Sequence, residues 1–249
     1  AGRMTCMTAN SRAAIPPQAL VGDLNRRDAN RAVWRIAWPS VLTFALMTTN
    51  SILDRIFVGR LGSDALAAVG VGGQVMFVTV ALAMAITVGT TALVARFTGA
   101  SQPDDADRAA GQSIALGATI GVVCAVGLLL AMGPLLRAMG VAGAAASQCK
   151  AFLTFAIPGM IPGNVGAVLS AAFRGLGDTR TPLKVMLAAN AVHIMGDWTL
   201  MLGHWGAPKM GLPGGGLAMS GSMLTSLVLF VVMVRRSPIK GCLRPSLLR

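Results

Sequence analysis

Charged side chains are scarce in this sequence. Aspartate, glutamate, lysine and arginine make up 12% of its 249 residues, whereas 54% of the residues are hydrophobic. Soluble domains carry about 25% charged residues, and a soluble core of this length cannot bury so much apolar surface. The composition therefore excludes an ordinary soluble domain and indicates an all-α, polytopic helical membrane protein.

Patterns of metal ligands and disulfides are also lacking. The cysteines are scattered along the chain, at Cys6, Cys124, Cys149 and Cys242, and their spacings match neither a zinc site nor a disulfide framework. We therefore expect no metal and no cofactor. About the first 25 residues are polar and lack a compact apolar segment before a small-residue cleavage site, so we expect no signal peptide.

The net charge of +12 does not indicate a nucleic-acid partner. The basic residues lie between apolar runs, which is typical of membrane topology. Six runs have about the 20 apolar residues that cross a bilayer: 33–58, 68–96, 110–136, 151–173, 183–203 and 213–234. From them we predict a polar cytoplasmic tail over residues 1–30, a six-helix transmembrane lobe over 31–236 and a cytoplasmic linker over 237–249.

The basic residues also predict an orientation. Sixteen of the 21 lysines and arginines lie in the two terminal tails and in the second and fourth loops, and the other five lie on the opposite side. Because cytoplasmic loops carry the excess of positive charge, both termini are predicted to lie in the cytoplasm. We therefore expect a multi-pass protein of the cell's inner (plasma) membrane.

Two carboxylates interrupt the apolar runs, although an ionised group in hydrocarbon is costly and marks a candidate functional site. At a rise of 1.5 Å per residue, Asp54 lies about 27 Å and Asp197 about 21 Å from the cytoplasmic start of its span. Asn50 shares the helix face of Asp54, and Asn190, His193 and Asp197 share another face. We predict that these two polar stripes meet in a wet cavity.

Simpler interpretations of these residues stay open. Each acid can lie near the outer interface and extend to water, particularly Asp54, which has Arg55 beside it. His193 alone is more often an interhelical hydrogen-bonding residue than a titrating group. Methionines at Met47, Met76, Met84, Met195 and Met201 can line an adaptable apolar cavity or simply pack between helices.

The segment "RGLGDTRTP" at 174–182 separates the fourth and fifth runs. We assign a cytoplasmic turn to Arg174, Gly175, Gly177, Asp178 and Pro182, with Thr181 as the cap of the next helix and Pro182 as its first residue. Its "GLGD" is similar to the motif of intramembrane aspartyl proteases, which would make the chain an enzyme. Proteolysis of that kind needs the acid inside a membrane span, whereas Asp178 precedes a turn sequence. We therefore expect that the chain is not an enzyme.

Three segments together resemble the multidrug and toxic compound extrusion (MATE) transporters: "LDRIFVGRLGSDALAAVGVGGQ" (53–74), "AAFRGLGDTRTPL" (171–183) and "AANAVHIMGDWTLMLG" (188–203). The likeness is nearest to the damage-inducible (DinF-like) branch and runs from about residue 30 to residue 244. It implies the N-terminal six-helix lobe of a twelve-helix antiporter, which exchanges protons or sodium for amphipathic, often cationic, drug-like compounds.

The resemblance also implies roles for individual residues. Asp54 and Asp197 match the family's coupling acids, Pro39 matches a proline where the first helix bends, and His193 and Asn190 match asparagines before the second acid. The sequence departs from the family at three positions. It has His193 in place of asparagine, Arg55 in place of a small polar residue, and Met219 in place of a threonine.

Either a proton or sodium is implied as the coupling ion, and the residues favour the proton. A low-dielectric cavity favours the neutral form of a carboxyl group, so Asp54 can take up a proton on one side of the membrane and release it on the other. Sodium needs several oxygen ligands, whereas His193 supplies a nitrogen. Pro39 offers a break where the helix can respond.

Two further hypotheses remain beside the antiporter. A lipid flippase of the related superfamily would carry a denser set of basic residues at depth, which these spans lack apart from Arg55. An inactive, truncated half-transporter is the other, because the second lobe of the family is missing from this sequence. We therefore expect a second lobe in cis, related by an axis along the membrane normal, or a homodimer partner.

Overall fold

The structure is a computed structural model that describes residues 26–206 and 208–235, and the described part is helical without strands. Its elements are α1 (Arg26–Gly59), α2 (Ser63–Gly99), α3 (Pro103–Ala138), α4 (Gly143–Ala156), η2 (Ile157–Gly159), α5 (Met160–Gly175), α6 (Arg180–Gly196), η3 (Asp197–Met201) and α7 (Leu212–Val234). The predicted linker (237–249) and most of the predicted tail (1–30) lie outside the described residues. Residues 26–30 already belong to α1, so the helix begins earlier than predicted.

The apolar runs of the sequence are almost entirely helical, and most of the helices extend beyond the run. The first three runs lie in α1, α2 and α3, and α2 begins at Ser63 rather than at residue 68. The fourth run spans α4, η2 and α5, with a short 3₁₀ segment at Pro158. The helices are longer than the runs because helical hydrogen bonding continues into the polar residues at each end.

Five helical stretches in the described part are long and apolar enough to cross a membrane: Val41–Gly59, Ser63–Gly99, Pro103–Ala138, Gly143–Gly175 and Leu212–Val234. The predicted fifth span, at 183–203, corresponds to α6 followed directly by η3 and is not among these five. From Arg180 to Met201 it extends about 33 Å. Its polar residues, among them Asn190, His193 and Asp197, make it less apolar than the others.

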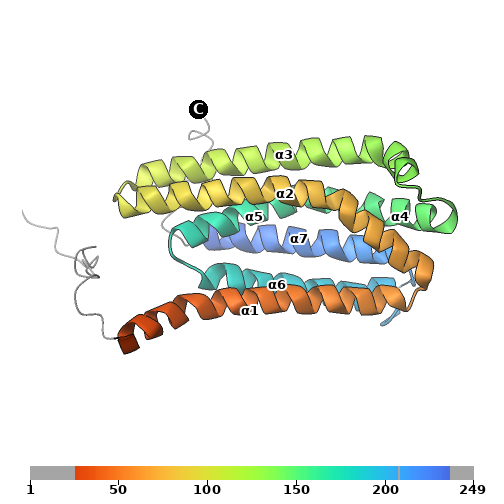
Figure 1. Cartoon of the computed structure of the whole chain (residues 1–249), viewed down its shortest axis with the longest axis horizontal. Coiled ribbons are helices and arrows are strands. Elements are labelled where there is room, and N and C mark those ends of the chain that lie inside the picture. The colour runs from red at the N-terminus through yellow and green to blue at the C-terminus, as the bar shows by residue number, and fades with distance from the viewer. Residues whose placement is uncertain (1–25, 207, 236–249) are drawn as a thin grey trace, which may run out of the picture.

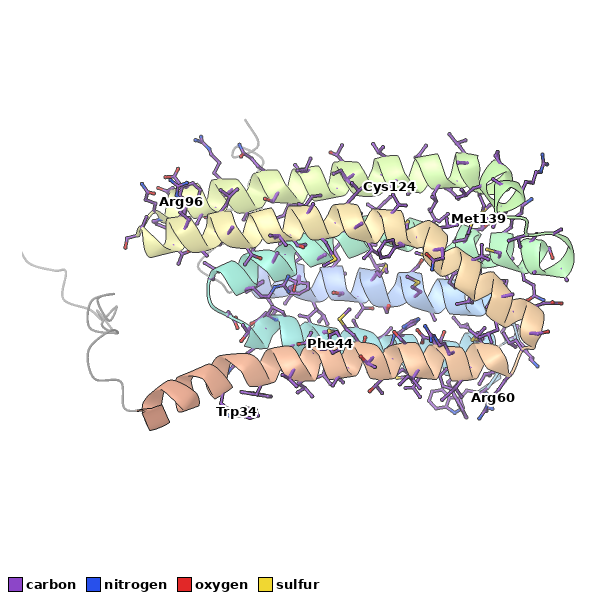
Figure 2. All side chains as sticks on the ribbon, in the orientation of Figure 1. Trp34, Phe44, Arg60, Arg96, Cys124 and Met139 are labelled. Atoms are coloured by element: carbon purple, nitrogen blue, oxygen red, sulfur yellow. The ribbon has the colours of Figure 1, made fainter. Side chains whose placement is uncertain are left out.

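The helices form an elongated bundle with alternating chain direction (Figure 1). Helix α1 lies along α6, α2 lies along α3, and α4, α5 and α7 run between these two pairs. Arg96 lies at one end of the bundle, and Arg60 and Met139 lie at the opposite end (Figure 2). This alternation places successive loops at opposite ends, as a polytopic membrane protein requires.

Two buried apolar clusters hold the bundle together. One surrounds Leu153 and Ile157 near the α4–η2 junction, and the other surrounds Leu169, Phe173 and Phe230 between α5 and α7. The outer faces are also apolar, and Leu130 is 78% exposed. Because lipid is as apolar as these side chains, close packing rather than removal from water stabilises the contacts between helices.

The turn between α5 and α6 differs in detail from the prediction. The Asp178 Oδ1 atom accepts hydrogen bonds from the backbone N–H groups of Arg180 and Thr181, both at 3.0 Å, and its Oδ2 atom accepts one from the Thr181 hydroxyl at 2.6 Å. Asp178 therefore satisfies the free N–H groups at the start of α6, and the predicted cap at Thr181 is wrong. Pro182 is the third residue of α6 rather than the first.

Candidate functional site

Three ionisable side chains from distant parts of the sequence meet inside the bundle. Asp54 belongs to α1, His193 to α6 and Asp197 to η3. One carboxylate oxygen of each aspartate and one ring nitrogen of the histidine all lie within 4.8 Å of one another. We call these residues, together with Asn50, the polar cluster.

Asn50 joins the two sides of the polar cluster. Its Nδ2 atom lies 3.4 Å from Asp54 Oδ2, to which it donates, and 3.1 Å from Nδ1 of His193. With the amide in this orientation Nδ1 is the acceptor, so Nε2 carries the proton of a neutral imidazole ring. His193 Nε2 lies 3.7 Å from Asp197 Oδ2, and the cluster forms a continuous polar path from α1 to η3.

Within the polar cluster Asp197 is buried and the other three residues are half-buried, and the cluster is short of donors. The side chain of Asp197 is 4% exposed and that of His193 is 13% exposed. The Asn50 Oδ1 and Asp54 Oδ1 atoms are buried and have no hydrogen-bond partner. An unsatisfied buried acceptor costs about 1–3 kcal/mol, so a bound proton or cation would stabilise this arrangement.

Local backbone geometry helps to place Asp197. The η3 segment is π-helical, and the N–H of Leu202 bonds to the carbonyl of Asp197 at 3.2 Å, five residues earlier. Such π segments are rare and occur frequently at functional sites. The N–H of Asp197 still bonds to the carbonyl of His193, so the two side chains share one helix face, and the π segment begins directly after this turn.

A small cavity of about 60 Å³ adjoins the polar cluster. Its walls come from α1, α2, α4, α6, η3 and α7, and the lining residues are Asp54, Val58, Val69, Phe152, His193, Asp197, Met201, Leu212, Gly215 and Met219. A water molecule needs about 10–15 Å³ of such space. The cavity therefore has room for a few waters or for a hydrated ion beside the carboxylates.

A second, larger cavity of about 790 Å³ lies among α1, α2, α5, α6 and α7. Methionines line it at Met47, Met76, Met84, Met160, Met186, Met219 and Met223. Met219 lines both cavities and so separates the polar cluster from the larger space. Of the methionines singled out from the sequence, Met195 does not line either cavity, and Met201 lines only the small one.

The remaining residues singled out from the sequence lie elsewhere. Asn190 is on α6 but neither joins the polar cluster nor lines the small cavity. Pro39 lies within α1, which continues through it and is bent near its N-terminal end (Figure 1). Arg174 lies in the last turn of α5, donates to the Ser170 hydroxyl at 2.6 Å and lines the large cavity. Sequence reasoning missed the position of Met219 between the cavities; its departure from the family pattern was the available signal.

The MatE family model matches residues 39–199 of this chain. The chain is 31% identical over 230 residues to "Probable multidrug resistance protein NorM" of Burkholderia mallei, covering 90% of this chain and 47% of that protein. It is 28% identical to the protein of the same name from Thermotoga maritima, covering 74% of this chain and 40% of that protein.

Solved structures give the same likeness. One describes the outward-facing conformation of a multidrug resistance MATE family transporter of the MOP superfamily. It matches this chain with a TM-score of 0.75 and 29% identity, covering 83% of this chain and 45% of the other. The chain therefore spans less than half the length of the relatives that it matches.

Proposed function

This chain belongs to the MatE family, whose members are membrane transporters rather than enzymes, and we propose that it forms one lobe of a proton-coupled multidrug antiporter. In this proposal the lobe lies in the inner (plasma) membrane with both termini in the cytoplasm. A second lobe, in cis or as a homodimer partner, completes the transporter. The substrates are amphipathic, often cationic, drug-like compounds.

The polar cluster is the observation that carries the proposal. Its two carboxylates lie beside the imidazole of His193, one carboxylate buried and the other half-buried, and two buried acceptor atoms lack donors. A proton on Asp54 would turn one of its oxygens from an acceptor into a donor. Because Asn50 links α1 to α6 through His193, this change of hydrogen bonding acts directly on the contact between the two helices.

Coupling requires that proton and cargo favour different conformations of the lobe. The large cavity adjoins the polar cluster at Met219, so a movement of α1 against α6 changes the walls of both. Its volume of about 790 Å³ suits a drug-sized ligand, for which pockets of about 300–1,000 Å³ are usual. Flexible methionine side chains allow one cavity to fit unlike compounds.

Sodium is the alternative coupling ion, and a lipid flippase is the alternative function. The imidazole of His193 is a poor ligand for a hard cation, which prefers oxygen. A phosphate-bearing lipid would need several cations along its path. Arg174 is the one charged residue among those that line the large cavity in the described part of the chain. Both considerations support the proton-coupled drug antiporter.

A transport assay tests the proposal. The chain is co-expressed with the C-terminal lobe of the Burkholderia mallei relative, and the complex is reconstituted into proteoliposomes. We expect ethidium transport driven by a pH gradient without sodium. Asp54→Asn should reduce it to background, whereas Asp64→Asn, which alters an exposed acid in the first turn of α2, should leave it unchanged. Transport that runs on a sodium gradient and not on a pH gradient would overturn the proton assignment.

A further inference from the structure

We propose that the polar cluster is also a binding site for a divalent transition-metal ion of the Zn²⁺ class, held by Asp54, His193 and Asp197. This inference deepens the proposed function, because the metal would occupy the same residues that are proposed to carry the proton. Neither the family nor the names of the relatives assigns such a site to this chain.

The donor set points to this class of ion. Carboxylate oxygens and imidazole nitrogens are both ligands of zinc, and zinc sites with three protein ligands leave a fourth position for water. Hard cations such as sodium, magnesium and calcium prefer oxygen ligands alone. The histidine therefore favours a transition metal, and the two carboxylates balance the charge of a divalent ion.

The distances between the ligand atoms are close to those of a bound site. In a tetrahedron with bonds of about 2.0–2.2 Å, ligand atoms lie about 3.3–3.6 Å apart. His193 Nε2 and Asp197 Oδ2 are already 3.7 Å apart, and the ligand atoms of all three residues lie within 4.8 Å. In the proposed site the three side chains rotate so that these ligand atoms approach one ion.

Asn50 supplies the supporting contact that a metal-bound histidine needs. Such a histidine donates its second ring N–H to a carbonyl or carboxylate, which fixes the tautomer. If the metal binds at Nε2, then Nδ1 carries the proton and faces the Asn50 amide, 3.1 Å away. Rotating that amide by half a turn presents Oδ1, which is buried and without a partner, as the acceptor.

The small cavity leaves space for the ion and for its remaining ligand. Its volume of about 60 Å³ exceeds that of a single water, and it opens beside all three proposed ligands. Met201 and Met219 also line this cavity, and thioether side chains suit a soft or borderline ion better than a hard one. Met219 is the residue that the small cavity shares with the large one.

Co²⁺ absorption tests the site without any transport. The full 249-residue chain is purified in detergent, its affinity tag is removed, and Co²⁺ is titrated while the visible d–d bands are recorded. We expect bands of a four- or five-coordinate site that saturate at one equivalent and disappear when Zn²⁺ is added. Wild-type protein that gives only the weak spectrum of hexahydrated Co²⁺ would overturn the proposal.

The chain offers a matched control for the histidine, because it contains just two, His193 and His204. His193→Asn and Asp54→Asn should abolish the bands, while His204→Asn should leave them unchanged. Asn50→Ala should weaken binding about 10–100-fold, as expected for the loss of a supporting contact. Circular dichroism and size-exclusion chromatography confirm that each variant is folded. Loss of the bands in His204→Asn, with retention in His193→Asn, would place the metal elsewhere and refute the proposal.

X-ray absorption at the zinc edge gives a second readout on the wild-type chain alone. A zinc ion surrounded by one imidazole nitrogen and otherwise by oxygens would support the assignment. A spectrum that shows two or more imidazoles, or any cysteine sulfur, would contradict it. The two proposals fail separately. Metal binding without proton-driven transport removes only the antiporter mechanism, and Asp54-dependent transport without metal binding removes only the metal site.

Discussion

Asp178 shows how a single carboxylate can organise a turn. It accepts two backbone N–H groups and one hydroxyl at the start of α6, where the helix leaves its first donors free. The residue lies between α5 and α6, outside either helix. Its hydrogen bonds explain why an aspartate stands at this position without any catalytic role.

We expect Asp178→Ala to destabilise the protein by about 1–2 kcal/mol, the usual cost of losing a helix cap. Asp178→Asn should lose less, because its amide oxygen still accepts the backbone N–H groups. Asp104→Ala, which removes an exposed acid in the first turn of α3, is the control and should have the smaller effect. Thermal unfolding in detergent measures all three, and equal losses at residues 178 and 104 would contradict the assignment.

The sequence allowed part of the candidate site to be predicted. Asn50 and Asp54 are four residues apart, as are His193 and Asp197, so each pair shares one helix face. Asp54 and Asp197 lie at similar predicted depths in the membrane, which suggested that the two pairs meet. The π-helical turn at Asp197 was not predictable, because the i to i+5 pattern has no clear sequence signal. Met219 was also missed as a wall between two cavities, because its position depends on how α7 packs against the other helices.

At the scale of elements, α4 and α7 approach each other where α7 has a glycine. A Cβ atom built on Gly216 would lie 2.5 Å from the carbonyl oxygen of Phe152 and 3.2 Å from the backbone nitrogen of Ala156. Backbone atoms cannot rotate away as a flexible side chain can. The glycine therefore sets the distance between the two helices, in line with the small residues usual at membrane helix contacts.

We expect Gly216→Ala to destabilise the lobe by about 1–3 kcal/mol, because the added methyl group overpacks the contact. Gly221→Ala is the matched control on the same helix, since its Cβ would have no atom within 4 Å. That variant should be neutral or gain up to about 1 kcal/mol from helix propensity. Apparent Tm values in detergent distinguish the two, and a stable Gly216→Ala protein would show that α4 and α7 are not packed as described.

The sequence predicted some helices well and others poorly, and the reason is physical. Long apolar runs identified α1, α2, α3 and α7, because a membrane span needs little more than length and apolarity. The run at 151–173 gave no sign that α4 begins at Gly143 or that a 3₁₀ turn interrupts it at Pro158. Helix ends and local irregularities depend on backbone contacts with neighbouring helices, which composition does not encode.

For the whole molecule, the basic residues predict which end faces the cytoplasm. We expect a cysteine at position 180 to react with an impermeant thiol reagent only from the cytoplasmic side, and a cysteine at position 208 only from outside. Arg180 and Pro208 are both exposed, so each replacement should be reachable. Labelling intact cells, in a background without the four native cysteines, gives the answer. Reversed labelling would overturn the orientation and the comparison of depths for Asp54 and Asp197.

The chain is about half the length of its relatives. This chain covers 47% of the Burkholderia mallei relative and 45% of the outward-facing MATE family structure. The proposed antiporter needs a second lobe beside this one, and the chain supplies about half the length of these relatives. We therefore expect residues 1–249 alone to give no ethidium efflux from cells. Co-expression with a second lobe should restore efflux, and the same pair carrying Asp54→Asn should not. Efflux by the single chain, shown to be monomeric in detergent, would contradict this expectation, whereas efflux by a purified homodimer would identify a second copy as the partner.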